Sequence, residues 1–301
     1  MIGPEEVQHT MGSWLCSDGA LSAPYAAEQV NRSCVCDCRP LGVPSVPALA
    51  VEQCKHAMRR GRLCLGPFSL PSDATAVQQC DVIVGALTIS DGSDHGVSVV
   101  TGAVTIVGGN GSGVVDLRAL KFVGEFGMSS QATVAQLYAS ELRGTCGGSI
   151  GISYNSALTK VDLRRLGGTM NELNVVLNTA LVTLDVGSIG GGPMELTAGF
   201  RITGVGTSLR KVVGLSHVVQ MGYLSLCYVF DDVAWPFGHI NVTNGLEVSN
   251  TWYSGVLAMP QMRALTGSLV VLDNANITEV WLPLVTSIDN LGVGYNRVLT
   301  S

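Results

Sequence analysis

The sequence has few charged and few aromatic residues. Of its 301 residues only 13% are charged and 6% are aromatic, whereas aliphatic residues and 37 glycines dominate. Such a chain is too apolar for a disordered tail, and it lacks the charge that long solvent-exposed helices need. Basic residues cluster only at Arg59–Arg62, and the net charge is -6. We therefore expect no nucleic-acid partner, because a phosphate-binding surface needs clustered Lys and Arg.

Long apolar runs are also absent. No stretch of 18 uninterrupted apolar residues occurs, so the sequence predicts no transmembrane helix. The first residues, MIGPEEVQHTMG, lack the basic and apolar regions of a secretory leader. If the protein is exported, we therefore expect this sequence to be a mature or partial chain.

Two features nevertheless favour an extracellular or cell-surface location. Four Asn-x-Ser/Thr sequons occur, at Asn31, Asn110, Asn241 and Asn276. Seven of the nine cysteines lie in the first 80 residues, a density typical of disulfide-stapled modules: Cys16, Cys34, Cys36, Cys38, Cys54, Cys64 and Cys80. A thiolate metal site formed by the Cys-x-Cys-x-Cys run with His56 is the alternative. Its spacing is not that of a zinc finger, so we expect disulfides, no metal and no cofactor.

A repeat runs through the rest of the chain. Apolar pairs separated by one residue recur at steps of 17, 22, 24, 23, 27, 24, 22, 23 and 22 residues. The pairs are Leu87/Ile89, Val104/Ile106, Phe126/Met128, Ile150/Ile152, Leu173/Val175, Phe200/Ile202, Leu224/Leu226, Leu246/Val248, Leu269/Val271 and Leu291/Val293. This alternation is typical of half-buried strands, and its fixed step indicates a stack of similar units.

Other residue types recur along the chain at the same step. A second set of apolar pairs comprises Val115/Leu117, Leu137/Ala139, Val161/Leu163, Leu184/Val186, Val233/Trp235, Leu257/Met259 and Val280/Leu282. Asparagines follow the first strand at Asn155, Asn178, Asn274 and Asn296, where they can bond their own turn and a neighbouring coil. Glycine-rich segments are expected to supply corners that need positive φ.

These patterns predict an all-β fold: a parallel β-helix or solenoid of about nine to ten coils, 22–27 residues each, over residues 80–301. A β-sandwich is the alternative, but sandwich strands carry no fixed repeat. Residues 1–79 are expected to form a cysteine-rich, disulfide-stapled module that caps the first coil.

The segment QCDVIVGALTI, Gln79 to Ile89, with its Cys-x-x-Ile-x-Gly-x-Leu-x-Ile pattern, resembles the opening of the receptor L domain. This β-helical, leucine-rich-like module occurs in insulin and epidermal growth factor receptor ectodomains and in GPI-anchored fungal cell-wall proteins. The final NITEVWLPLVTSIDNLGVGYNRVLTS is similar to the fungal branch. The resemblance implies a right-handed, extracellular, non-catalytic β-helix used in ligand binding, adhesion or wall architecture. The family's paired domains and furin-like region have no counterpart here, so receptor signalling is not carried over.

One column of polar residues could carry chemistry. The outward residues of the second strand in four successive units are Asp116, Tyr138, Asp162 and Asp185. Neighbouring carboxylates could serve a carbohydrate-active enzyme. They also serve to keep a sheet face solvated, and Lys160, Arg164 and Arg165 stand ready to pair with Asp162. We expect the solvated face.

Aromatic residues offer a second candidate surface. Trp252, Tyr253 and Trp281 are expected to be exposed and to serve as binding residues. The segment Tyr228–Ile240 holds Asp231, Asp232, His239 and four aromatics, and could bulge outward to bind a sugar or a protein. Trp235, however, falls on the inward register, which favours core filling.

The expected function is that of a non-enzymatic extracellular structural or adhesive glycoprotein. The last segment, LGVGYNRVLTS, begins a further coil and stops before a second strand, so either the chain is a fragment or its open end stacks on another subunit. Stacking would assemble the chain end to end into a wall, sheath or filament. Self-association, other surface or wall proteins and glycans are the expected partners. A ligand-binding receptor ectodomain fragment and a carbohydrate-active β-helix enzyme are the alternatives.

Overall fold

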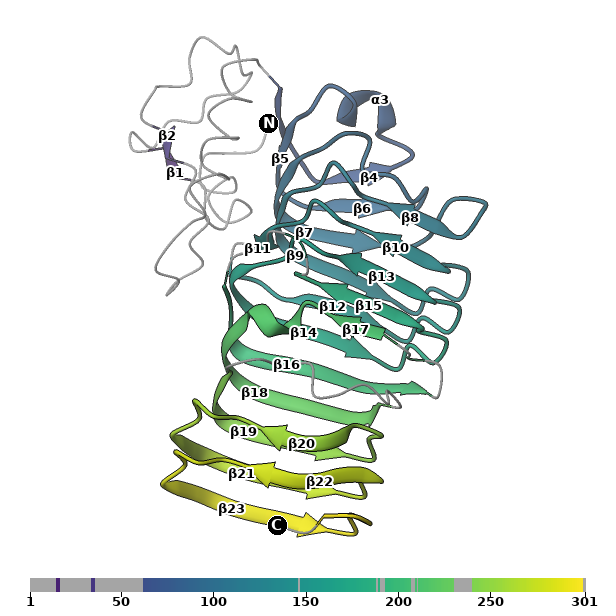
Figure 1. The fold of residues 1–301 in the computed structure, drawn as a ribbon. Helices are drawn as coiled ribbons and strands as arrows, with labels where there is room; N and C mark the ends of the chain where they lie inside the picture. The colour runs from purple at the N-terminus through teal and green to yellow at the C-terminus, as the bar shows by residue number, and fades with distance from the viewer. Residues whose placement is uncertain are drawn as a thin grey trace.

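The computed structural model is a stack of parallel β-coils (Figure 1). It describes residues 62–145, 147–187, 189, 193–206, 209, 211–229 and 240–299, together with two short strands, β1 (Leu15–Cys16) and β2 (Cys34–Val35). The coils make about nine turns, which confirms the predicted solenoid. No described helix is long and apolar enough to cross a membrane.

The largest sheet has 14 strands and runs the length of the stack. Its strands are β3 (Leu63–Leu65), β4 (Phe68–Leu70), β5 (Val82–Val84), β6 (Leu87–Ile89), β7 (Val99–Ile106), β9 (Phe122–Ser129), β11 (Gly144–Thr145), β12 (Ile150–Ser153), β14 (Gly168–Val176), β16 (Met194–Gly206), β18 (Val218–Val229), β19 (Asn241–Ser249), β21 (Ala264–Leu272) and β23 (Ser287–Gly294).

Two smaller parallel sheets close the other side of the coils. The five-stranded sheet comprises β8 (Val114–Asp116), β10 (Gln136–Tyr138), β13 (Lys160–Leu163), β15 (Thr183–Val186) and β17 (Lys211–Val213). The two-stranded sheet pairs β20 (Ser254–Ala258) with β22 (Asn276–Trp281). Helical structure among the described residues is limited to α3 (Ala74–Val77) and the short 3₁₀ turn η1 (Leu215–His217).

The register of the large sheet confirms the predicted interior column. Each apolar pair from Leu87/Ile89 to Leu291/Val293 lies directly opposite the pair of the next coil. Leu173 and Val175, for example, are fully buried and face Phe200 and Ile202. The described members of the second column are in register as well, and Val212 of β17 belongs to it opposite Leu184, a member that the spacing missed. Its predicted members Val233 and Trp235 lie outside the described residues. Because a short strand pair cannot bury a face alone, stacking is what creates this core.

The parallel ladder begins before the boundary expected between residues 79 and 80. Strand β3 pairs with β5, and β4 pairs with β6, with Phe68 opposite Leu87 and Leu70 opposite Ile89. Residues 63–70 therefore supply an earlier coil with the same inward pair. A disulfide between Cys64 and Cys80 ties this coil to the start of the next one.

The asparagine ladder is confirmed atom by atom. The Asn178 Nδ2 group donates to the Ile152 carbonyl at 2.8 Å, and its Oδ1 accepts from the backbone N–H and the side-chain amide of Asn155 at 3.1 and 2.9 Å. Asn274 and Asn296 repeat the arrangement near the other end. Asn155, Asn178 and Asn274 are fully buried, so these bonds satisfy backbone groups that no strand reaches.

Glycines supply several corners with positive φ, as expected, among them Gly113, Gly147 and Gly187. The turn that follows the first strand of each coil, where the ladder asparagines lie, is different. A left-handed residue stands there in coil after coil, and most of these residues carry a side chain: Ser130, Tyr154, Leu177, Asn250, Asp273 and Tyr295, with φ between 53 and 60°. The asparagine bonds that follow hold the backbone in a conformation which a side chain disfavours.

Candidate functional site

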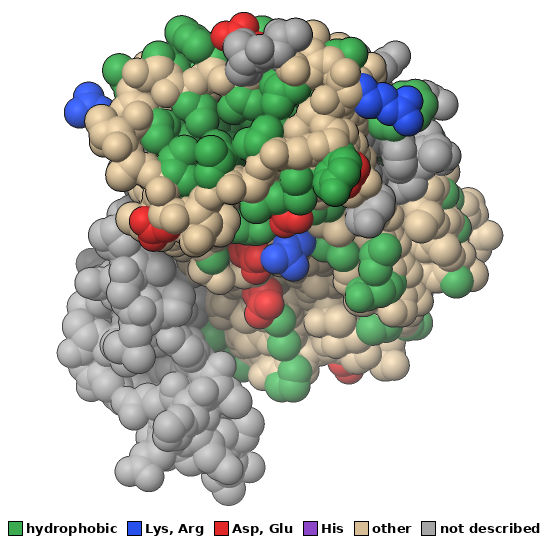
Figure 2. Space-filling view, turned by 90° about the horizontal axis from the view of Figure 1, so that it is seen from below, with side chains coloured by type: hydrophobic (Ala, Val, Ile, Leu, Met, Phe, Trp, Pro, Cys, Tyr) green, Lys and Arg blue, Asp and Glu red, His purple; other side chains and the backbone are tan. Residues whose placement is uncertain are grey.

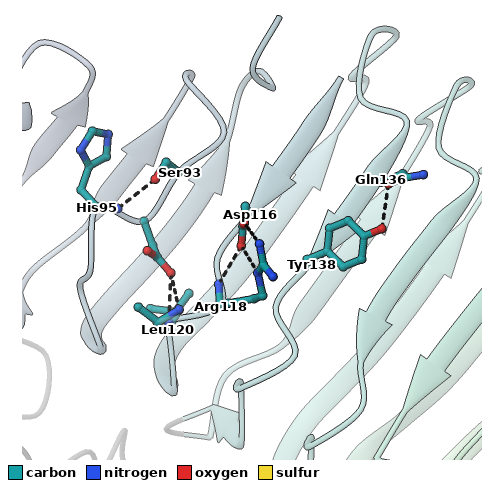
Figure 3. A network of polar contacts seen from close by, with 9 residues as sticks. Ser93, His95, Asp116, Arg118, Leu120, Gln136 and Tyr138 are labelled. Atoms are coloured by element: carbon teal, nitrogen blue, oxygen red, sulfur yellow. Dashed lines mark hydrogen bonds and ion pairs between the residues drawn. The ribbon is translucent and has the colours of Figure 1, made fainter. Parts of the chain in front are cut away.

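The predicted polar column lies on the five-stranded sheet. Asp116, Tyr138, Asp162 and Asp185 are direct neighbours in successive coils, so the structure brings all four together. Figure 3 shows the first part of the column, with Asp116 next to Tyr138.

The expectation that this column is a solvated face is wrong for Asp162. Its side chain is only 2% exposed and forms an ion pair with Arg164, whose Nε lies 2.8 Å from Oδ1. Asp116 forms the same pair with Arg118, Nε to Oδ1 at 2.8 Å, and the Arg118 hydrogen bond lowers the pKa of Asp116. The shared Asp-x-Arg spacing lets each arginine fold back over its own carboxylate, which leaves that carboxylate occupied.

Of the two remaining members of the column, Tyr138 makes polar contacts with described residues. The Tyr138 hydroxyl donates to Gln136 Oε1 at 2.8 Å, and the Lys160 ammonium lies 4.8 Å from the centre of the Tyr138 ring. Arg165 pairs with Glu141 at 2.7 Å. Asp185 Oδ1 is buried without a hydrogen-bond partner. Ion pairs thus occupy the carboxylates of Asp116 and Asp162 on this face.

A buried carboxylate next to this column has a structural role. Asp94 is 6% exposed and accepts hydrogen bonds from the backbone N–H groups of Gly96, Ala119 and Leu120. Burial raises the pKa of Asp94 in spite of these bonds. Its bonds join two successive coils at a corner.

The expected aromatic surface is only partly present. Trp252 and Trp281 are 51% and 45% exposed, as expected. Tyr253 is 2% exposed, so its expected role as a surface binding residue is wrong: it lies beside Trp252 in sequence but belongs to the core. Consecutive residues at a corner point to opposite sides, which the local sequence did not reveal. Most of the segment Tyr228–Ile240 lies outside the described residues.

The sequons and cysteines fall in different environments. Asn110 is exposed in a turn, where its Oδ1 accepts from Ser112 and Val114, while Asn241 and Asn276 begin β19 and β22 and are partly exposed. In β1 and β2, Cys16 lies opposite Cys34 in an antiparallel pair. Asn31, Cys36, Cys38 and Cys54 lie outside the described residues.

A polar groove on the outer face of the large sheet was not predicted from the sequence. It has a volume of about 500 Å³ and crosses strands β16, β18, β19 and β21. Its lining consists of Arg201, Thr203, Ser225, Cys227, Glu247, Ser249, Asn250, Leu272 and Asp273. We call it the outer groove.

Glu247 is the centre of the outer groove. Its Oε2 accepts hydrogen bonds from the Tyr223 hydroxyl at 2.8 Å and from the Ser225 hydroxyl at 3.3 Å. The Ser249 hydroxyl lies 3.5 Å from Oε1 and 3.2 Å from the Cys227 sulfur. Ser225 and Ser249 are themselves 3% and 7% exposed, so the carboxylate is held by a pre-positioned polar network.

This network sets the protonation of the groove. Burial acts to raise the pKa of Glu247, but the hydrogen bonds from Tyr223, Cys227, Ser225 and Ser249 outweigh it and lower that pKa. Burial and the bond to Glu247 raise the pKa of Tyr223 to about 12. Burial likewise raises the pKa of the Cys227 thiol. At neutral pH the groove therefore presents a carboxylate beside a neutral phenol and a neutral, weakly nucleophilic thiol.

A sequence signal for this groove did exist. Its central residues stand between the members of the inward pairs, Arg201 in Phe200/Ile202, Ser225 in Leu224/Leu226 and Glu247 in Leu246/Val248. The outward column predicted from the sequence lies on the second strand, whereas the first strand carries one of its own. What the sequence could not indicate is which of these outward residues border a hollow.

Among the described residues, no group of three His, Cys, Asp or Glu side chains could hold a metal ion. Comparison with family models, with curated proteins and with solved structures gives no match for this chain. The fold therefore defines the class: a parallel β-solenoid with ion-paired aspartates on one sheet and a polar groove on the other.

Proposed function

We propose that this chain is a non-enzymatic, extracellular structural or adhesive solenoid that associates end to end. The observation that carries the proposal is the surface of the last described coil. Strand β23 pairs with β21 on one side and with no described strand on the other. Among the described strands nothing covers this second edge of β23, and an uncovered edge of this kind can accept a further strand.

In this last coil, side chains at core positions are exposed. Leu291 and Val293 are 65% and 47% exposed, while Leu269 and Val271, at the same positions one coil earlier, are 2% and 0% exposed. Trp281, Leu284, Tyr295 and Val298 add further exposed apolar area, between 43% and 86% each. Figure 2 looks onto this end of the stack and shows hydrophobic side chains gathered there. A contiguous apolar patch of this kind is typical of an interaction surface.

A second copy of the chain is the occupant that fits best. The exposed pair has the spacing and inward direction of an interior rung, so what complements it is another β-coil with aliphatic residues at the same two positions. The chain itself consists of such coils. Covering each of these side chains is worth about 1.5–3 kcal/mol, and pairing the free strand edge adds hydrogen bonds.

Two features support the extracellular part of the proposal. The Cys64–Cys80 disulfide is of a kind that persists in oxidising compartments. The Asn110 sequon lies in an exposed turn, which is the setting that glycosylation requires. Mass spectrometry of protein from its native source, with and without glycosidase, tests this: unmodified sequons at Asn110, Asn241 and Asn276 would count against a glycoprotein.

End-to-end association is tested by sedimentation velocity and negative-stain electron microscopy over a range of concentrations. We expect the chain to form dimers or longer rods, and the double variant Leu291→Lys, Val293→Lys to remain monomeric, because two charges cannot be buried in the new rung.

The control is Val107→Lys, which places one such charge on a residue that is 48% exposed but lies beside an early strand. This variant is expected to associate like the unaltered chain. Monomers of the unaltered chain at high concentration, or equal association of all variants, would contradict the proposal.

Ligand binding is the second candidate, because the outer groove is a concave polar surface complete within one chain. Catalysis on polysaccharides is less well supported, since Asp116 and Asp162 are both paired with arginines. Polysaccharide cleavage that disappears in the variant Asp162→Asn, Asp185→Asn would favour the enzyme over the structural role.

A further inference from the structure

The outer groove is a built feature of the sheet, because neighbouring glycines make room for one aromatic residue. The Tyr223 ring lies over Gly245, where an added Cβ would be 2.6 Å from the ring carbon Cδ2. Gly199 flanks Tyr223 on the preceding coil, and a Cβ there would meet its Cβ at 3.0 Å. Glycine at position 245 thus makes room for the ring, whereas glycine at position 199 makes room for the Tyr223 backbone, whose carbonyl oxygen would lie 2.4 Å from an added Cβ. The Tyr223 hydroxyl reaches Glu247 from this position.

Charge is distributed unevenly along the groove. Glu247 lies two strands away from Arg201 in the same outward column, and Asp273 stands at the corner after β21. Arg201 is exposed and forms no ion pair with the described residues. Two carboxylates against one guanidinium leave the groove with an excess of negative charge, which disfavours anionic ligands.

The remaining polar groups define the ligand further. The Ser225 and Ser249 hydroxyls donate within the network around Glu247 and keep lone pairs that can accept from a ligand. The Thr203 hydroxyl can donate and accept, and Asn250 offers both an amide N–H and a carbonyl. Thr203 Oγ1 is buried without a hydrogen-bond partner. A ligand that matches many closely spaced groups of this kind must itself carry adjacent donors and acceptors, as vicinal hydroxyls do. Leu272 adds an apolar patch against which carbon-bound hydrogens of the ligand can pack.

The dimensions agree with such a ligand. Neighbouring strands are spaced about 4.8 Å apart, so the groove, which crosses four strands, extends over roughly 14 Å along the stack. A thiolate nucleophile is not offered, because Cys227 is buried and protonated. The groove is therefore suited to reversible binding.

We propose that the outer groove binds a short neutral or amino-bearing saccharide, with Glu247 accepting hydrogen bonds from its hydroxyl or ammonium groups. This site deepens the adhesive role but does not rest on end-to-end association, because β16 to β21 of a single chain form it completely.

The test begins with a screen of immobilised neutral, amino and acidic oligosaccharides, followed by calorimetry with N,N′-diacetylchitobiose, chitosan disaccharide and digalacturonate. We expect saturable binding of neutral or amino saccharides and no binding of digalacturonate. Glu247→Gln is expected to lower affinity about tenfold, since a hydrogen bond to a charged group is lost. Asp273→Asn, at an exposed corner where asparagine tolerates positive φ, is expected to weaken binding of the amino saccharide more than that of the neutral one.

Glu125→Gln is the matched control, because Glu125 is an exposed carboxylate on β9 of the same sheet, away from the groove. The Leu291→Lys, Val293→Lys variant is expected to bind the saccharide normally, which separates this site from association. Asp273→Asn keeps the test valid should Glu247→Gln fail to fold, as circular dichroism would report. Failure of every neutral and amino saccharide to bind, preference for acidic ones, or binding unchanged in the folded groove variants would overturn the proposal.

Discussion

At the scale of single residues, the buried asparagines show how a solenoid corner is stabilised. Each ladder asparagine donates to the carbonyl of an inward residue one coil earlier: Met128, Ile152, Val248 or Val271. Each also accepts a backbone N–H from a neighbouring coil at 2.9–3.1 Å, with the same geometry at both ends of the stack. One amide thus replaces the strand hydrogen bonds that the corner interrupts.

Replacing a ladder asparagine should therefore be costly. We expect Asn178→Ala to lower the free energy of unfolding by about 2–4 kcal/mol, because the Ile152 carbonyl and the Asn155 N–H lose their partner while remaining buried. Chemical denaturation followed by circular dichroism measures this change. Asn290→Ala, at an exposed position on β23, is the control and should alter stability little. Equal effects of the two substitutions would refute the ladder's role.

Glu247 predicts a particular dependence of stability on pH. Its folded-state pKa is lowered from 4.5, so the folded protein binds a proton less readily than the unfolded chain does. The stabilisation is present above pH 4.5 and is lost as the pH falls through the lowered value. We expect the unaltered chain to lose more stability on acidification than Glu247→Gln, in thermal melts between neutral pH and about pH 3. Glu125→Gln should retain the original dependence; parallel curves for all three proteins would contradict the assignment.

At the scale of elements, the long strands bend at β-bulges, where one residue of a strand faces two residues of the neighbouring strand. Between β7 and β9 the register shifts from Val100–Val123 to Ala103–Glu125, so Gly124 alone faces Thr101 and Gly102. Such a bulge bends the strand and lets one sheet continue around the coil. A Cβ on Gly124 would overlap the Thr101 carbonyl oxygen, which explains why glycine stands there.

The same strand provides a matched test of this close approach. We expect Gly124→Ala to destabilise the protein by about 1–3 kcal/mol, because the backbones of two coils must separate. Gly127→Ala, also in β9, meets nothing within 4 Å and should be neutral or slightly stabilising, since alanine reduces the freedom of the unfolded chain. Denaturation midpoints of the two variants decide the matter, and a loss at Gly127 equal to that at Gly124 would show that packing between coils is not the cause.

At the scale of the whole molecule, stability should vary along the stack. Each coil contacts only its neighbours, so an interior strand such as β14 is paired on both sides, whereas β23 is paired on one among the described strands. We expect amide hydrogen exchange to be slowest near β14 and fastest in β23 at low protein concentration. Protection of β23 should rise with concentration if ends associate, and uniform exchange along the stack would contradict this gradient.

Much of the interior was predictable from the sequence, and much of the surface was not. The column from Leu87/Ile89 to Leu291/Val293 was legible because apolar residues must return to the same side once per turn. The coil at β3 and β4 was missed, since its single pair, Phe68 and Leu70, stands among prolines and cysteines. The burial of Asp162 and of Tyr253 was missed because it depends on side chains from other coils.

By itself, then, the sequence determined the period, the inward columns and the asparagine corners, since each of these is a requirement that every unit meets on its own chain segment. Tertiary structure decided which outward residues are covered, that Arg165 meets Glu141 of the preceding coil, and where Glu247 and Arg201 border a hollow. These properties arise between coils, from side chains more than 20 residues apart that stacking brings within contact distance. A repeat specifies its own interior, but its surface exists only after the units have been stacked.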